Sequence, residues 1–256
     1  MGNYRQLREF DPRSMKLSDE YIRMIDGQIT KHLLHESDFA FLSRYDPGSA
    51  IMIDVGSNIG NSALSANNAC PGIRIFGFEP NHILKIYLDN VSSLLSNYSY
   101  KLVGLSNSSG SFKLYIPVVD NFLIVGESSL DIEHFSLDTV SQRLIGYSRS
   151  GHFDLTVIQC EIETLDDQKE LFEASTSARA CLVKVDVEGS ELSVLEGGVN
   201  FIRKFKPTLL IEEGHRPEIC EFLFRFGYKR YLWNDPLATV ELADHHESLN
   251  SFFIPD

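Results

Sequence analysis

The stretch Ile51-Met52-Ile53-Asp54-Val55-Gly56-Ser57-Asn58-Ile59-Gly60 decides the fold class of this chain. Its first five residues form a short apolar run of the kind found in buried parallel strands. Gly56 and Gly60 then allow a tight turn and close backbone approach, and small residues through Cys70 continue as a helix. A strand, a glycine-rich turn and a helix in this order predict a ligand site above the end of the strand.

The same alternation of apolar strands and helices continues along the chain. Further strands are predicted at 73–78, 101–105, 181–187 and 207–213, with helices at 82–96, 190–205 and 218–226 and a final pair of strands from Gly227 onward. Short apolar strands joined by helices are typical of a parallel sheet with helices on both faces. The sequence therefore predicts an α/β, Rossmann-like, doubly wound domain over residues 48–256.

Two segments depart from this alternation. Residues 1–47 are predicted to be an N-terminal helical extension, in which Ser18 caps a helix. Apolar residues at helical spacing mark that helix: Ile22, Ile25, Ile29 and Leu33. Residues 106–160 form an insertion, where Phe112, Leu114 and Ile116 alternate with polar residues as in an antiparallel hairpin. Because inserted segments of wound sheets often contact substrate, we expect this one to face it.

Composition excludes several classes of protein. The 256 residues carry 23 Lys and Arg against 36 Asp and Glu, a net charge of −13, with no concentrated basic patch. Such a chain repels phosphate backbones, so nucleic acid is not an expected partner. No run approaches the ~20 apolar residues of a membrane span, and the four cysteines lack metal-site spacing. These features favour a cytoplasmic protein, and they neither require nor exclude a homo-oligomer.

The glycine-rich turn distinguishes between two classes of nucleoside cofactor. A dinucleotide fingerprint needs three glycines, and Asn58 and Asn61 occupy two of their places. Asp54, just before the turn, would oppose a pyrophosphate but suits a cationic ligand such as S-adenosylmethionine, which carries a sulfonium and an ammonium group. Glu79 ends the next strand, where a carboxylate accepts hydrogen bonds from both ribose hydroxyls.

A second acidic cluster ends the strand at 181–187. Alternation along a strand places Lys184, Asp186 and Glu188 on one side, where they contact the cofactor and supply a base for a hydroxyl nucleophile. Glu212 and His215 follow the next strand, so His215 is a rival base. Asp186, Glu212 and His215 could instead hold a divalent cation. No compact ligand motif supports that alternative, and no metal site is assigned.

Together these segments resemble the FkbM family of S-adenosylmethionine-dependent methyltransferases over residues 50–256. The match includes residues 54–60 and the Phe78-Glu79-Pro80 strand end, and its most specific part is Val183 through Glu191 with the later Leu195-Glu196-Gly197-Gly198. Gly104 through Asn107, Ser128-Ser129-Leu130, Thr164-Leu165-Asp166 and Phe253-Ile254-Pro255 follow in the family's order. Ser57 and Ser190 are mild departures from its pattern.

The resemblance implies a class I methyltransferase fold with an antiparallel last strand. It implies S-adenosylmethionine as cofactor, S-adenosylhomocysteine as product, and O-methylation of a sugar, glycan or natural product. The residues that it places at the cofactor are Asp54, Gly56, Ser57, Asn58, Gly60, Glu79, Ser106, Asn107 and Asp186, with Ser106 and Asn107 flanking the adenine.

Two other functions compete with methyl transfer. A binding or regulatory protein could keep the cofactor pocket without turnover, although the carboxylates at both strand ends argue against it. A nicotinamide-dependent oxidoreductase is disfavoured by the missing glycines at 58 and 61. We therefore predict an O-methyltransferase that acts by in-line displacement, with Asp186 as base or orienting group and with Lys184 and Glu188 around it.

Overall fold

A computed structural model describes residues 4–212, 216–243 and 248–256. Its main sheet has eight strands in the order β13-β12-β14-β11-β10-β3-β4-β5. Five of them run parallel: β3 (Ala50–Val55), β4 (Arg74–Phe78), β5 (Tyr98–Lys101), β10 (Ala180–Val185) and β11 (Thr208–Glu212). The last strand, β14 (Asn250–Pro255), is antiparallel to both β11 and β12 (Tyr228–Asn234), and β13 (Thr239–Leu242) extends the edge. The predicted Rossmann-like fold with an antiparallel last strand is confirmed.

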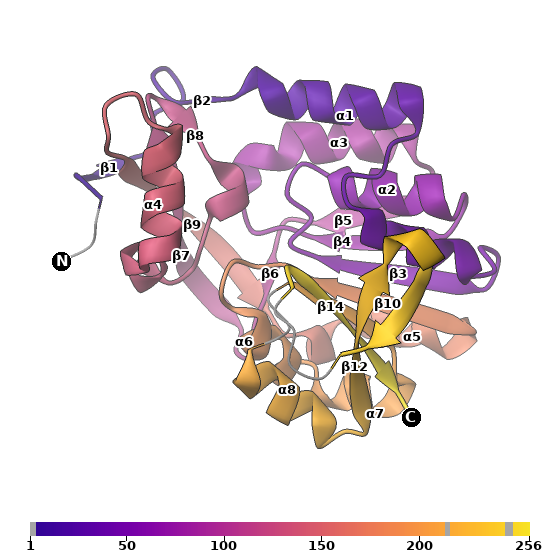
Figure 1. Ribbon diagram of the computed structural model, residues 1–256. Coiled ribbons are helices and arrows are strands. Elements are labelled where there is room, and N and C mark those ends of the chain that lie inside the picture. Colours follow the sequence, from indigo (N-terminus) through magenta and orange to yellow (C-terminus); the bar gives the residue numbers. More distant parts are fainter. Residues whose placement is uncertain (1–3, 213–215, 244–247) are drawn as a thin grey trace.

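Helices cover both faces of this sheet (Figure 1). On one face lie α1 (Asp19–Lys31), α2 (Asn61–Ala69) and α3 (Lys85–Leu94), with the 3₁₀ helix η1 (Ser37–Arg44) packed on α2. On the other lie α5 (Lys169–Ser177), α6 (Glu191–Glu196), α7 (Val199–Phe205) and α8 (Pro217–Phe224). All six residues of β3 are buried, because this strand lies in the middle of the sheet with helices above and below it.

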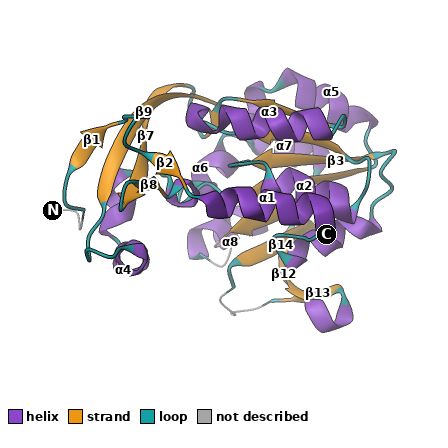
Figure 2. Cartoon of the chain, turned by 90° about the horizontal axis from the view of Figure 1, so that it is seen from above, coloured by secondary structure: helices purple, strands orange, loops and turns teal. Residues whose placement is uncertain are grey.

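The insertion forms a sheet of its own beside the main one (Figure 2). Its strands are β6 (Gly104–Leu105), β7 (Gly110–Val119), β8 (Phe122–Leu123) and β9 (Asp154–Glu163), joined by β1 (Leu7–Glu9) and β2 (Lys16–Leu17). The long β7 and β9 pair antiparallel, which agrees with the hairpin predicted from the alternation near Phe112. Helix α4 (Asp138–Tyr147) packs on this sheet through Val140 and Leu144.

The N-terminal extension is only partly helical. Ser18 caps α1 as predicted, but the residues before it form β1 and β2, which pair with β9 and β8 of the insertion. The side chain of Asp154, 4% exposed, receives Arg5 at 2.7 Å and Arg8 at 2.9 Å, and this pairing holds β1 in place. Ile22, Ile29 and Leu33 are exposed rather than packed, so their helical spacing does not mark the buried face of α1.

Two predicted elements are divided in the structure. The run at 101–105 is split between β5 in the main sheet and β6 in the second sheet, because the chain turns at 102–103 to pair with β9. The helix predicted at 190–205 is broken into α6 and α7 at Gly197 and Gly198. A Cβ on Gly197 would lie 2.0 Å from the carbonyl oxygen of Ser106, so glycine is required where these segments touch.

Candidate active site

The carboxyl ends of β3, β4, β10 and β11 border a cavity that also receives residues from the insertion. The glycine-rich turn forms its floor, with Gly56, Asn58 and Gly60 all in the left-handed region at φ 86°, 48° and 88°. A Cβ on Gly56 would lie 1.8 Å from the carbonyl oxygen of Asp186. Only glycine therefore lets the ends of β3 and β10 approach this closely, and that approach brings the two predicted motifs into one site.

Glu79 is held in the cavity wall by two backbone donors. The backbone N–H of Asn58 donates to its Oε2 and that of Asn81 to its Oε1, both at 2.8 Å. Burial raises the pKa of Glu79 to about 7, against the lowering effect of these hydrogen bonds. The carboxyl group is thus fixed in orientation at the strand end, where the sequence analysis placed it.

Asp54 and Ser57 support the floor instead of lining the cavity. Both are fully buried; the hydroxyl of Ser57 donates to the carbonyl oxygen of Asp54 at 3.0 Å. The carboxyl group of Asp54 faces Lys184 Nζ at 3.8 Å, below the turn. Burial raises the pKa of Asp54, and Lys184 opposes that rise. Neither side chain lines the cavity. These two predicted cofactor residues are therefore positioned to affect a ligand indirectly, Ser57 by holding the backbone of the turn and Asp54 by facing Lys184.

Lys184 and Asp186 form a buried ion pair at the end of β10. Lys184 Nζ lies 2.8 Å from Asp186 Oδ2, and the Lys184 side chain is 4% exposed. Burial lowers the pKa of Lys184, but Asp186 and Asp54 outweigh it and keep the pKa above its usual range. Burial likewise raises the pKa of Asp186, and Lys184 outweighs it, so the net shift is downward. Asp186 is thus held ionised and in one orientation.

Two further carboxyl groups lie against Asp186. Oxygens of Asp186, Glu188 and Glu212 all fall within 4.8 Å of one another. Burial, followed by Glu127 and Asp186, raises the pKa of Glu188 to about 9, and burial followed by Asp186 raises that of Glu212 to about 11. Both groups hold their protons at neutral pH unless a cationic ligand enters the cavity.

Ser106 and Asn107 lie outside the lining of the cavity. Their neighbours Gly104 and Leu105 line it instead. The amide of Asn107 donates to Glu196 at 3.0 Å, which ties the segment to the end of α6. These two side chains, which were predicted to flank the adenine, therefore do not line the cavity directly. His215, the predicted rival base, lies outside the described residues.

The family follows once this geometry is compared with known proteins. The family model for the methyltransferase FkbM domain matches residues 54–230, well over half of the chain. This range includes the turn after β3 and the end of β10, which both border the cavity. This chain belongs to the FkbM methyltransferase family. The predicted resemblance is confirmed, and the protein is a methyltransferase by family.

Relatives of this FkbM methyltransferase include a fungal protein. Methyltransferase sdnD of Sordaria araneosa is 27% identical over 201 residues, which are 71% of this chain and 74% of that protein. A crystal structure of methyltransferase FkbM from Methylobacillus flagellatus aligns with a TM-score of 0.49 at 17% identity, covering 93% of this chain and 56% of that one. A precorrin-6y C5,15-methyltransferase from Geobacter metallireducens aligns with a TM-score of 0.40 at 9% identity, covering 85% and 83%.

His35 and Glu36 of the FkbM methyltransferase also border the cavity, and the sequence analysis missed both. The hydroxyl of Ser65 accepts from Gln28 Nε2 at 2.7 Å and from the backbone N–H of His35 at 2.9 Å. The Ser65 hydroxyl therefore donates its own proton to His35 Nδ1 at 3.0 Å. Because Nδ1 accepts, the proton of the neutral imidazole lies on Nε2. Burial lowers the pKa of His35 to about 3, and the ring is a neutral donor.

No local pattern marks His35 as a site residue. Its ring is oriented by Ser65 and Gln28, which lie on α2 and α1 respectively. The amide orientation of Gln28 is itself set by the carbonyl oxygen of Asn61, which accepts from Nε2 at 2.9 Å. The contact exists only because the N-terminal extension packs on α2. A search for sequence motifs cannot detect packing between separate segments of the chain.

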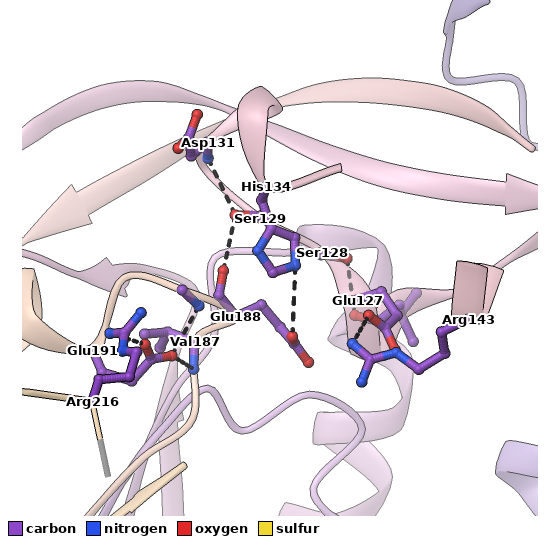
Figure 3. Close-up of polar contacts among 12 residues, drawn as sticks. Glu127, Ser128, Ser129, Asp131, His134, Arg143, Val187, Glu188, Glu191 and Arg216 are labelled. Atoms are coloured by element: carbon purple, nitrogen blue, oxygen red, sulfur yellow. Dashed lines mark hydrogen bonds and ion pairs between the residues drawn. The ribbon is translucent and has the colours of Figure 1, made fainter. Parts of the chain in front are cut away.

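The insertion brings a second group of ionisable residues against Glu188, which lines the cavity (Figure 3). Glu127 lies in the 3₁₀ turn η3 (Val125–Glu127) and His134 in η4 (Ile132–Ser136), and both approach Glu188. Arg143 of α4 forms an ion pair with Glu127. The insertion was expected to face substrate, and it does supply side chains to this end of the site, but the sequence analysis named neither Glu127 nor His134.

A second cavity of about 630 Å³ adjoins the first. It lies between α1 and the insertion, and Gly126 lines both cavities. Its walls combine the exposed rings of Phe122 and Tyr147 with the charged groups of Asp120 and Arg149. The volume is in the range of small-molecule sites. Among the described parts of the chain, no helix is long and apolar enough to cross a membrane.

Proposed function

We propose that this methyltransferase transfers a methyl group from S-adenosylmethionine to a hydroxyl oxygen of a sugar, glycan or natural product. The observation that carries the proposal is the set of carboxyl groups around the first cavity. Glu79, Asp186, Glu188 and Glu212 all border it, and Lys184 lies buried beneath. Asp186 is already ionised, and the other carboxyl groups lose their protons more readily when a ligand with a sulfonium and an ammonium group enters, whereas the pyrophosphate of a dinucleotide would find acidic groups in its place.

The residues at the strand ends fit the parts of this cofactor. Glu79 is oriented to accept the ribose hydroxyls, the turn at 56–60 offers close backbone approach, and Asp186 faces the cavity as an anion. Bound there, S-adenosylmethionine supplies an electrophilic methyl group whose bond to sulfur breaks with its electron pair on sulfur. These residues account for cofactor recognition without any phosphate-binding group.

Asp186 is the residue of this chain best placed to take the proton of the acceptor. Of the three clustered carboxyl groups, Asp186 has its pKa lowered, while those of Glu188 and Glu212 are raised. It is therefore ionised when the acceptor oxygen bonds to the methyl carbon and releases its proton. Lys184 keeps the carboxylate charged and fixes its direction.

The second cavity is proposed to hold the acceptor. It meets the first at Gly126, so a molecule in it reaches toward the cluster at Glu188. The rings of Phe122 and Tyr147 offer apolar faces, and Asp120 and Arg149 offer hydrogen-bonding groups. Ring-shaped acceptors with several hydroxyl groups use both kinds of surface.

Calorimetric titration with S-adenosylhomocysteine tests the cofactor assignment, with NADH as a control in the same buffer. We expect one site per chain with micromolar affinity, about tenfold or more weaker in Glu79→Gln because the fixed acceptor charge is lost. Glu161→Gln, on an exposed face of β9, is the matched control and should bind as the parent does. A folded sample that binds NADH and not S-adenosylhomocysteine would overturn the proposal.

Asp186→Asn tests the chemical role. Methyl transfer in a screen of sugar and natural-product acceptors should fall by about 10²–10⁴-fold, while affinity for S-adenosylhomocysteine changes much less. Asp26→Asn, exposed on α1, serves as the control. Unchanged turnover in Asp186→Asn would remove this carboxylate from the reaction. Cofactor binding with no transfer to any acceptor would assign a binding role instead.

A further inference from the structure

Glu127, His134 and Glu188 converge from three separate segments of the chain. One ligand atom from each lies within 4.8 Å of the other two. Figure 3 shows the imidazole of His134 above the carboxyl group of Glu188, and His134 Nε2 lies 3.9 Å from Glu188 Oε2. The side chains of Glu127 and His134 are each 11% exposed and that of Glu188 is 19% exposed. The group is thus sheltered but open to a small ion.

The backbone around the three residues is built to keep them together. The hydroxyl of Ser129 donates to the carbonyl oxygen of Glu188 at 3.0 Å, which joins the insertion to the loop after β10. Gly189 has φ +97°, and a Cβ there would lie 3.2 Å from His134 Nδ1. The ring of His134 therefore packs directly over that glycine, and its Nε2 edge is directed at Glu188 (Figure 3).

Two carboxyl groups and one imidazole are a ligand set for a divalent transition metal, and binding of the ion would displace the proton that Glu188 otherwise holds. Mn²⁺ and Zn²⁺ accept both oxygen and imidazole nitrogen, whereas Mg²⁺ prefers oxygen alone. With bonds of about 2.1 Å, ligand atoms at right angles lie about 3 Å apart and opposite ones about 4.2 Å. The 3.9 Å between His134 Nε2 and Glu188 Oε2 lies between these two values.

We propose that Glu127, His134 and Glu188 bind one divalent transition-metal ion where the two cavities meet. Glu188 and Ser128 line the first cavity, Glu127 lines the second, and Gly126 lines both. Arg143 bonds one oxygen of Glu127, the kind of outer contact that orients a ligating carboxylate.

The neighbouring group of Asp186, Glu188 and Glu212 is a poorer metal site. It contains no imidazole, and it borders the part of the cavity assigned to the cationic cofactor. Each group has a basic side chain on one of its carboxylates, Lys184 on Asp186 and Arg143 on Glu127, so that feature does not separate the two. The histidine therefore distinguishes the site at Glu127 as the one for a transition metal.

The chemical role of this ion rests on the proposed function, whereas its binding does not. A divalent ion at the junction would bind the acceptor hydroxyl, lower its pKa and turn the oxygen toward the first cavity. The ligands come from the insertion as well as from the main domain, so the ion would also hold the acceptor side of the molecule against the cofactor side.

Titration of EDTA-dialysed protein with Mn²⁺, followed by electron paramagnetic resonance of the free ion, tests the site directly, and calorimetry does so for Zn²⁺. We expect one saturable site per chain, weakened at least tenfold in His134→Ala and in Glu127→Gln. His152→Ala, a histidine of the same insertion bonded to Ser150, is the matched control and should bind as the parent does. Circular dichroism confirms that each variant is folded.

The remaining outcomes separate this proposal from the cofactor assignment. Absence of saturable binding of either ion, or binding that survives His134→Ala, overturns the metal site. So does binding that is lost in Glu212→Gln but kept in His134→Ala, because the ion then lies in the neighbouring group. Titration of the same samples with S-adenosylhomocysteine reports on the cofactor cavity alone, so either proposal can fail without the other.

Discussion

Both sheets of this methyltransferase contain strand pairs far apart in the chain, such as β3 with β10 and β1 with β9, but they differ in how the residues that face the cavities are encoded. In the main sheet, each ligand-facing group follows its own strand directly: the turn after β3, Glu79 after β4 and Asp186 after β10. In the second sheet, β1 pairs with β9, and Arg5 bonds Asp154 across 149 residues. The proposed cofactor side is therefore encoded in short local motifs, and the proposed acceptor side depends on contacts between segments far apart in the chain.

The two sheets also use charge differently. Beneath the cofactor cavity, Asp54 and Lys184 are both buried, and each carries the cost of desolvation. In the second sheet, Asp154 is buried but its partners Arg5 and Arg8 reach it from the surface, with side chains 52% and 29% exposed. Buried charge at the cofactor end implies a stiff, preorganised site, whereas the ion pairs that hold β1 on the second sheet are partly open to water.

Gly56→Ala should have the largest effect and tests how strictly the two motifs depend on their close approach. The added Cβ would lie 1.8 Å from the carbonyl oxygen of Asp186 in a left-handed residue, so we expect a loss of at least about 5 kcal/mol or no folded protein. Gly72→Ala is the control, because Gly72 is also left-handed at φ +89° but no heavy atom lies within 4 Å of its added Cβ. That variant should lose only about 1–2 kcal/mol in urea unfolding. Equal losses would refute the role of the contact.

Lys184→Met asks whether buried charge is what stiffens the cofactor side. Without the ammonium group, the fully buried Asp54 and the partly exposed Asp186 lose their shared partner, and urea unfolding should show a loss of about 3–5 kcal/mol at neutral pH. The folded-state pKa of Asp54, already raised by burial, then rises further and that of Asp186 rises as well, so stability should fall further as pH rises and recover toward acid. Lys85→Met, in an exposed pair with Asp89, should change nothing measurable. A pH-independent loss would point to packing instead.

Asp154→Ala asks whether the acceptor side loosens on its own. Removing the shared partner of Arg5 and Arg8 should cost about 1–2 kcal/mol and speed amide hydrogen exchange in β1 and β9. Exchange in β3 and β10 and affinity for S-adenosylhomocysteine should stay as in the parent. Glu161→Ala on the exposed face of β9 is the control. Weaker cofactor binding in Asp154→Ala would show that the two sheets are coupled more tightly than their contacts indicate.

The smallest expected effect is a pH dependence confined to the cofactor side. The pKa of Glu79 is raised to about 7, and its ionised form is the better acceptor for hydroxyl groups, so affinity for S-adenosylhomocysteine should rise about threefold from pH 6.5 to 7.5. The folded protein binds this proton more tightly than the unfolded chain, whose glutamate titrates near 4.5, so the Glu79 contribution to stability falls as pH rises between about 4.5 and 7. Glu79→Gln should flatten both profiles. An unchanged profile would assign the titration to another group.

The sequence by itself determined the cofactor side. An apolar run, a turn with Gly56 and Gly60, and an acid at 79 predict a strand, its turn and its ligand edge because periodicity and turn chemistry are local properties of the chain. The stretch from Lys184 to Glu191 likewise placed Lys184 and Asp186 on one side of a strand, since residues two apart share a face, and the two side chains are paired in the structure. The family also follows from these stretches.

Only the tertiary structure decided which side chains reach the cavity. Asp54 stands in the strongest motif yet is turned beneath the floor, while His35, in a segment without any motif, is oriented at the cavity by Ser65. Glu127 and His134 meet Glu188 only after the insertion docks on the loop that follows β10. Contacts of this kind depend on how separate elements pack, and packing is a property of the whole core that no short stretch of residues encodes.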